Sequence, residues 1–196
     1  MLVALILQKY ERGIFMKRVL CLISCMNTGG AETFLMKIYR QIDKTKYQMD
    51  FCVNIQQKGF YDNEITALGG KIYYIPSKSS NVREFKKQLD ELIRKEKYEV
   101  ILRITSSAAG FLDLKVAKKA GVKRCCVRSS NSSDGGSMLS VIAHRMGRLL
   151  YDKYVDVKIA PSDLAAKYTF GKKAYDNHEV NILHNAVDTS IFQYKE

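Results

Sequence analysis

Short apolar runs and longer amphipathic stretches alternate along the chain. The first apolar run, Val19–Ile23, has the continuous hydrophobic pattern of a strand covered on both faces. The residues Asn27–Gly30 interrupt this run, and apolar residues then recur at helical spacing from Phe34 to Ile42. The stretch 16–42 therefore predicts a buried strand, a glycine turn and an amphipathic helix.

The same alternation continues through the rest of the chain. Further strands are predicted at 49–54, 71–75, 100–104, 125–128, 155–160 and 180–183. Helices are predicted between them at 61–68, 81–93, 105–120, 138–150 and 162–170, and glycines end several of them. This order indicates right-handed crossovers between parallel strands. The predicted fold class is α/β, a Rossmann-like three-layer domain with a central, mostly parallel sheet of about six to seven strands.

Two of the predicted helices have distinctive faces. Asn81 followed by Glu84 predicts a helix N-cap whose acid bonds back to the cap residue. The helix that follows carries basic residues on one side, which are either solvated, the interpretation that the sequence favours, or in contact with anionic lipid headgroups. These residues are Arg83, Lys86, Lys87, Arg94 and Lys97. The apolar residues that define the amphipathic helix at 138–150 are Met138, Leu139, Ile142, Met146, Leu149 and Leu150.

Length and composition indicate a folded domain. The 196 residues are enough for one large domain or two very small ones, and the 46% of hydrophobic residues excludes disorder. Residues 1–15 precede a second methionine and are interpreted as an extension upstream of a natural start at Met16. The apolar run Leu2–Leu7 within them is too short to cross a bilayer. A short membrane-touching extension is the alternative.

The net charge of +12 suggests an anionic partner, which is nucleic acid, a phosphorylated substrate or an anionic membrane. Nucleic acid is the weakest of the three, because the basic residues are spread over many helices and do not alternate with aromatic residues. The five cysteines include no CxxC pair, which predicts reduced, structural thiols in a cytosolic protein. Cys125 and Cys126 are expected on opposite faces of one strand.

The sequence contains no motif for metal binding or for nucleophilic catalysis. The histidines His144, His178 and His184 are not at ligand spacing, and neither GxSxG nor GxxxxGK[ST] occurs. Gly29-Gly30 is therefore the one candidate for a phosphate-binding turn. A strand that passes through glycines into a helix directs free backbone N–H groups at a ligand above the sheet. The alternative is a tight turn that needs glycine only for its geometry, and this stretch alone does not separate the two.

Polar loops gather where ligands of parallel sheets bind. These loops follow the carboxyl ends of the predicted strands, at 25–30, 105–110, 129–137, 161–163 and 184–188. Four of the five are rich in Ser, Thr, Asn or Gly, so they can hydrogen-bond sugar hydroxyls and phosphates. Loops are polar in any case, which is the simpler explanation.

Six segments, in order, resemble a known family. They are GGAETFLM (29–36), YDNEITALGGKIYYIP (61–76), AKKAGVK (117–123), VRSSNSSDGG (127–136), IAPSDLAAKYTFG (159–171) and HNAVDTSIF (184–192). Together they are similar to the N-terminal domain of family 4 glycosyltransferases, the retaining group with the GT-B fold. The bacterial members that build capsular polysaccharide and exopolysaccharide are the most similar. The resemblance covers residues 16–196, which are therefore interpreted as an acceptor-side, Rossmann-like domain.

The resemblance implies a reaction and a set of site residues. The reaction is the transfer of a hexose from a nucleotide-sugar to a saccharide or polyprenyl-linked acceptor, with no metal and no cofactor beyond the nucleotide-sugar co-substrate. Gly29 and Gly30 would admit the donor's phosphates and sugar. An arginine on the acceptor side could hold a pyrophosphate, or could instead be paired with a carboxylate. The residues implied to bind the acceptor are Arg103, Arg128, Ser129, Ser130 and Asn131.

Three departures from the family pattern limit this interpretation. The histidine that many relatives carry after the fifth strand is replaced by Arg128–Asn131, and Ala186 stands where glycine is usual. The sequence ends at Glu196, where the donor-binding domain should begin. The expectation is thus a cytoplasmic domain, peripheral to the inner face of the plasma membrane and inactive alone. The alternatives are an acceptor-binding subunit that docks with a separate donor-domain chain, and a non-catalytic nucleotide- or nucleic-acid-binding module.

Overall fold

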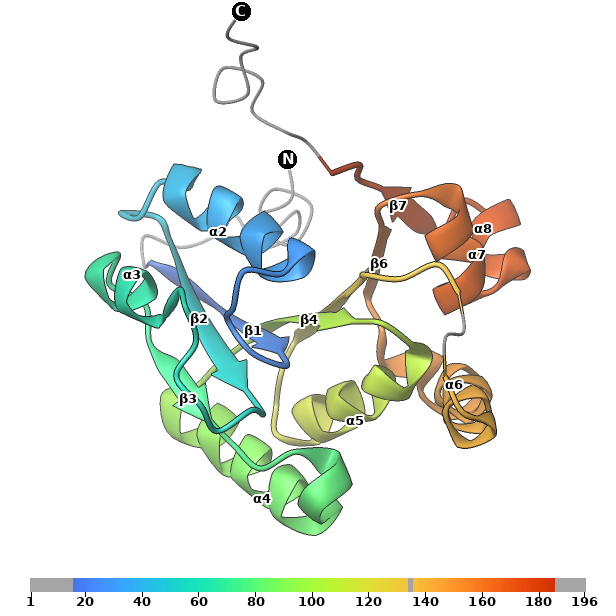
Figure 1. The fold of residues 1–196 in the computed structure, drawn as a ribbon, viewed down its shortest axis with the longest axis horizontal. Helices are drawn as coiled ribbons and strands as arrows, with labels where there is room; N and C mark the ends of the chain where they lie inside the picture. The colour runs from blue at the N-terminus through green and yellow to red at the C-terminus, as the bar shows by residue number, and fades with distance from the viewer. Residues whose placement is uncertain (1–15, 134–135, 186–196) are drawn as a thin grey trace, which may run out of the picture.

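A seven-stranded parallel sheet forms the centre of the molecule (Figure 1). The computed structural model describes residues 16–133 and 136–185. The strands lie in the order β3-β2-β1-β4-β5-β6-β7, so the sheet grows outward in both directions from β1 and β4. They are β1 (Lys17–Ile23), β2 (Tyr47–Val53), β3 (Ile72–Tyr74), β4 (Val100–Thr105), β5 (Arg124–Ser129), β6 (Val157–Ala160) and β7 (Val180–Ile182). The predicted Rossmann-like α/β fold is confirmed, whereas the expectations for residues 1–15 and for Ala186 lie outside the described residues.

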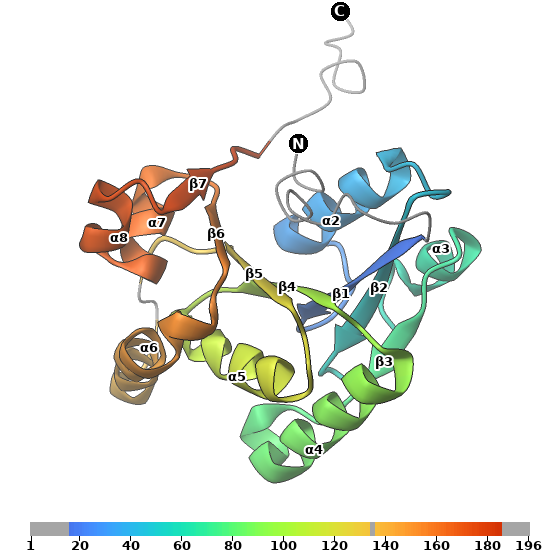
Figure 2. The same ribbon diagram turned by 180° about the vertical axis from the view of Figure 1, so that it is seen from behind.

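Helices cover both faces of the sheet, as the two opposite views show (Figures 1 and 2). The helices are α2 (Gly30–Gln41), α3 (Asp62–Ala67), α4 (Lys78–Glu96), α5 (Phe111–Lys119), α6 (Met138–Tyr151), α7 (Asp163–Phe170) and α8 (Lys172–Asp176). Two single turns of 3-10 helix, η1 (Ala108–Gly110) and η2 (Asp152–Tyr154), flank α5 and α6. Residues of α2 and α3 belong to one hydrophobic cluster, and residues of α4, α5, α7 and α8 belong to the other.

The apolar strand runs are continuous because each strand packs on both faces. In β1, Leu20 and Leu22 join the α4–α5 side of the core, while Val19, Cys21 and Ile23 join the α2–α3 side. In β5 the adjacent thiols separate in the same way, as predicted. Burial raises the pKa of both of these thiols, Cys125 and Cys126, to about 12, so they remain protonated and unreactive at neutral pH.

The start of α4 shows one prediction half confirmed. Asn81 has a non-helical backbone, and its Oδ1 accepts a hydrogen bond from the Glu84 N–H at 3.0 Å, as expected of an N-cap. The reciprocal bond is not made, because the Asn81 N–H donates to the Ser77 carbonyl and Glu84 accepts from Gln88. An additional turn, capped by Ser77, precedes Asn81.

A network of charged and phenolic groups ties β1 and β2 to the last turn of α4. The buried Asp50 accepts hydrogen bonds from Arg18 Nε and from the Tyr98 hydroxyl, each at 2.8 Å. Glu96 in turn binds Lys71 Nζ at 2.8 Å and Arg18 Nη1 at 3.2 Å. Because Arg18 contacts both carboxylates, the network links strands β1 and β2 to the end of α4.

The Glu96 carboxylate gives this network a pH dependence. The hydrogen bonds from Lys71 and Arg18 lower the pKa of Glu96 from its ordinary 4.5 to about 2. Its contribution to stability is therefore present above pH 4.5 and is lost as the pH falls from about 4.5 to about 2. We expect the free energy of unfolding of the E96Q variant, measured with urea between pH 4.5 and pH 2, to lack this part of the decrease. Identical pH profiles for the variant and the wild type would contradict the assignment.

Helix α6 differs from the other long helices in what it turns toward the core. Its buried residues are His144 and Gly147, whereas the six apolar residues that define its amphipathic pattern are exposed. The absence of a side chain at Gly147 is required by packing, since a Cβ there would collide with the backbone carbonyl of Ala108 in η1. His144 fixes the same contact by accepting a hydrogen bond from the Ala108 N–H at Nδ1, at 3.1 Å.

Candidate functional site

The carboxyl ends of β1, β4 and β5 bring most of the predicted site residues to one edge of the sheet. The Ser130 N–H donates to the Thr105 carbonyl at 2.9 Å, which joins the loops after β5 and β4. The guanidinium of Arg128, at the end of β5, stacks over the ring of Phe34 in α2 at 3.7 Å. The glycine turn before α2 and the polar loop after β5 are therefore neighbours, as the parallel topology predicts.

Neither glycine of the turn is required by its backbone conformation or by packing. Gly29 has φ −76° and ψ 167°, which any residue adopts, and Gly30 is not among the glycines of positive φ. A Cβ on Gly30 would meet no atom within 4 Å, and one on Gly29 would meet only the flexible carboxylate of Glu32. The tight-turn explanation for these glycines is thus disfavoured, and the approach of a ligand to them stays a prediction.

The start of α2 has the features of an anion-binding helix terminus. The N-cap residue is Gly29, which supplies no side-chain hydrogen bond to the first N–H groups of this 12-residue helix. The carboxylate of Glu32, in the first turn, lies beside Gly29 and accepts a weak hydrogen bond from the Cys25 thiol at 3.8 Å. Glu32 therefore interacts favourably with the positive end of the helix.

Arg128 is a buried cation beside this helix terminus. Its side chain is 2% exposed, Nη2 donates to Asn185 Oδ1 at 2.6 Å, and Nε has no hydrogen-bond acceptor among the described residues. Within that part of the chain no carboxylate forms an ion pair with it, and burial lowers the pKa of its guanidinium to about 10. The Phe34 ring and the Asn185 amide oxygen offset part of the cost of burying this cation but do not neutralise it, so Arg128 adds positive potential to the site.

Arg103 has a different environment from Arg128. Its Nε lies 2.8 Å from the Asp113 carboxylate, which also binds Lys78 Nζ at 2.6 Å, and its Nη1 donates to the Leu22 carbonyl at 3.0 Å. This is the arrangement of the alternative considered from the sequence, an arginine paired with a carboxylate. A direct contact of Arg103 with an acceptor stays a prediction.

The polar loop after β5 contains both buried and exposed residues. The hydroxyl of Ser129 is buried and shares a hydrogen bond of 2.6 Å with Thr169. Ser130 and Asn131 are exposed, and the Asn131 amide makes hydrogen bonds within its own loop, to the Ser133 carbonyl and from the Ser132 N–H. Sequence reasoning missed Phe34 and Asn185, which hold the Arg128 side chain. Asn185 lies in the HNAVDTSIF segment, but nothing in that segment predicts its contact with Arg128.

The described residues offer no group of three or more His, Cys, Asp or Glu side chains that could hold a metal ion. His144 is occupied in packing, since its ring stacks on Tyr168 at 4.5 Å and its Nε2 lies 3.1 Å from the Tyr168 carbonyl. The site as described consists of backbone N–H groups, hydroxyls, an amide and a buried arginine. Such a set can bind phosphate and sugar hydroxyl groups.

A parallel, Rossmann-like sheet with helices on both faces is the architecture of one half of a GT-B protein, and the comparisons with known proteins agree with this class. The model of Glycosyltransferase Family 4 matches residues 28–191, so the chain belongs to this family. Over 180 residues it is 32% identical to the Bacillus subtilis (strain 168) protein named "Putative glycosyltransferase EpsF". That alignment covers 90% of this chain and 47% of EpsF.

Solved structures of low sequence identity share the fold. Anabaena HepE, in complex with UDP and glucose, has a TM-score of 0.60 at 12% identity, with 91% of this chain and 47% of HepE covered. MnaA of S. aureus, in complex with UDP, has a TM-score of 0.59 at 18% identity, with 92% of this chain and 48% of MnaA covered. MurG of Acinetobacter baumannii has a TM-score of 0.58 at 10% identity, with 89% of this chain and 47% of MurG covered. The chain thus spans about half the length of the proteins that it matches.

No helix among the described residues has both the length and the apolar character needed to cross a bilayer.

Proposed function

We propose that this chain is the acceptor-side half of a retaining glycosyltransferase that transfers a hexose from a nucleotide-sugar. The acceptor would be a lipid-linked saccharide in the synthesis of capsular polysaccharide or exopolysaccharide, at the cytoplasmic face of the plasma membrane. The name of EpsF, the UDP found in two neighbours of similar fold and the net charge of +12 support this proposal. The nucleic-acid hypothesis has no support beyond the charge.

The observation that carries the proposal is the pair of glycines at the start of α2, next to the buried Arg128. Backbone N–H groups of the first turn would bind a phosphate of the donor, and the arginine would favour the negative charge that develops on the leaving diphosphate. The exposed Ser130 and Asn131 would bind hydroxyl groups of the acceptor. The remaining contacts to the donor would come from a second domain, in the same protein or in a partner chain. We expect no transfer by residues 1–196 alone.

Nucleotide binding can be tested at the glycine turn. We expect millimolar UDP to shift the amide NMR signals of residues 29–33, and uridine, which lacks phosphates, to shift them far less. The G30A variant should keep the melting temperature of the wild type, because a Cβ there meets no atom within 4 Å, while the UDP-dependent shifts weaken several-fold. The S79A variant, altered at the start of α4, should respond to UDP like the wild type. Equal shifts by UDP and uridine, or a G30A variant that binds UDP normally, would count against the proposal.

A further inference from the structure

Helix α6 has its apolar face turned directly away from the protein. At 100° per residue, the buried His144 and Gly147 lie on one side of the helix, and Ile142 and Met146 lie on the opposite side. Leu149, Met138 and Leu139 extend this outward face and are 83%, 81% and 77% exposed. Amphipathic helices of globular domains normally pack this face on the core. In α6 the face with the small and polar residues packs on the core instead.

The outward face is accompanied by positive charge. The sequence of α6 contains no Asp or Glu, and Arg145 lies exposed beside the apolar residues. Lys153 follows at the exposed end of the helix. The nearest acidic residues after the helix are already paired, Asp152 with Lys158 and Asp156 with Lys118. No negative side chain of α6 would therefore oppose an anionic surface.

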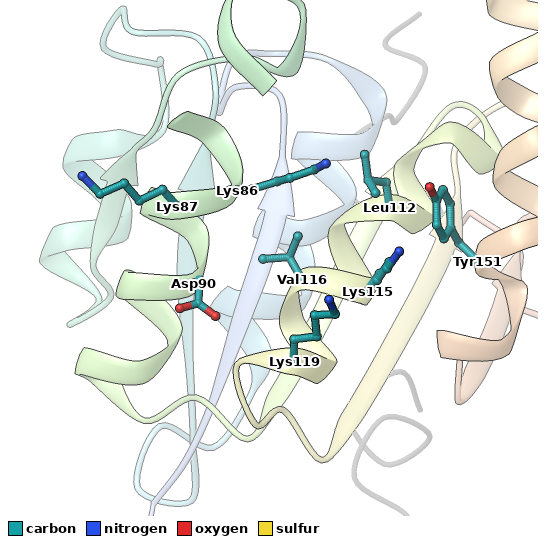
Figure 3. A pocket seen from close by; sticks show the side chains of 8 residues that line it. All are labelled: Lys86, Lys87, Asp90, Leu112, Lys115, Val116, Lys119 and Tyr151. Atoms are coloured by element: carbon teal, nitrogen blue, oxygen red, sulfur yellow. The ribbon is translucent and has the colours of Figure 1, made fainter. Parts of the chain in front are cut away.

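A groove lined by lysines begins where α6 ends. It lies between α4 and α5, has a volume of about 420 Å³ and is bordered by Tyr151, the last residue of α6 (Figure 3). Lys86 points from α4 toward α5, Lys115 points toward Tyr151, and Lys87 points away from the groove (Figure 3). The Lys115 Nζ lies 5.4 Å from the centre of the Tyr151 ring, and Lys119 also lines the groove. The only carboxylate among the lining residues, Asp90, binds Arg94 at 2.8 Å. The groove is therefore a cationic pocket next to the apolar helix.

We propose that α6 lies on an anionic bilayer, with its apolar face among the acyl chains and a phosphate-bearing lipid headgroup in the lysine groove. An apolar stripe with arginine at its edge and no acidic residue is the composition of an interfacial helix. Basic residues near the surface add attraction to anionic lipids. The position of α6 at the rim of the helical layer in both views leaves its outer face unobstructed (Figures 1 and 2). This inference rests on the membrane association in the proposed function and supplies its surface.

The test uses the full chain and vesicles of two compositions, pure phosphatidylcholine and phosphatidylcholine with phosphatidylglycerol. We expect cosedimentation with the phosphatidylglycerol vesicles only, and weaker binding as salt is raised. The L139Q/L149Q variant should bind at least tenfold more weakly, because two leucines leave the acyl region. The L164Q variant, altered at an exposed leucine of α7, should bind like the wild type. The K86Q/K119Q variant should lose several-fold more affinity than the charge-matched K44Q/K172Q variant.

Three outcomes would overturn the inference. The first is the absence of vesicle binding, and the second is equal binding to both vesicle compositions. The third is self-association of the wild-type chain in sedimentation, together with an L139Q/L149Q variant that is monomeric but binds vesicles as the wild type does. This result would show that the apolar face of α6 binds a second copy of the chain. The UDP titration is made without vesicles, so its result tests the proposed function separately.

Discussion

The D50A variant is expected to lose about 3–5 kcal/mol of the free energy of unfolding, the cost of breaking a buried ion pair by removing one partner. Asp50 is fully buried and accepts from Arg18, from the Tyr98 hydroxyl and from the Lys71 N–H at 2.8 Å. Alanine would leave all three donors without this acceptor. A loss of this size approaches the whole stability of many domains, so much of the variant should be unfolded at 37 °C.

Urea unfolding followed by circular dichroism measures this loss. The control is D43A, because Asp43 is exposed and its contacts, an ion pair with Lys46 and hydrogen bonds from Thr45, lie at the surface, where ion pairs add little to stability. A D50A variant as stable as D43A would show that the network contributes little.

The second large effect is expected at Arg103. The R103M variant should lose about 3–5 kcal/mol, since Asp113 is then left buried with Lys78 as its one remaining cation. The double variant R103M/D113L should recover only part of this loss, because it removes the buried carboxylate together with Arg103 but leaves Lys78 without its partner. If Arg103 bound the acceptor and did not contribute to stability, R103M would be as stable as the wild type.

A surface control separates these outcomes from a general effect of removing arginine. Arg94 is exposed and pairs with Asp90 four residues earlier, so R94M should leave the stability close to that of the wild type. Chemical denaturation of the three variants completes the comparison. Equal losses in R103M and R103M/D113L would mean that the Asp113 pair is not the source of the instability.

The fold could be predicted because its pattern is local. The run Val19–Ile23 and the stops at Gly69 and Gly121, both of positive φ, depend on neighbouring residues alone. The orientation of α6 could not be predicted in this way. Periodicity shows that a helix has an apolar face, but the side that packs was decided by Gly147, whose missing Cβ admits the backbone of η1.

The candidate site was predictable in its location but not in its contacts. Parallel topology alone brings Gly29, Gly30 and Ser129–Asn131 to one edge of the sheet. The two arginines were assigned the same role from sequence, yet Arg103 is paired with a carboxylate, whereas Arg128 pairs with none of the carboxylates that the structure describes. The difference arises from Asp113 and Asn185, which are distant in sequence from the strand ends that they contact.

Under the proposed function, the carboxylate of Glu32 beside Gly29 would affect how tightly the nucleotide product is held. A diphosphate that binds at the start of α2 would have to displace this carboxylate from the helix end, an interaction worth about 0.3–1 kcal/mol. The diphosphate would therefore be held about two- to fivefold less tightly. When the nucleotide product left, Glu32 would return to the helix terminus and hinder its rebinding. The side chain would thus act as a tethered competitor that shortens the residence time of the product.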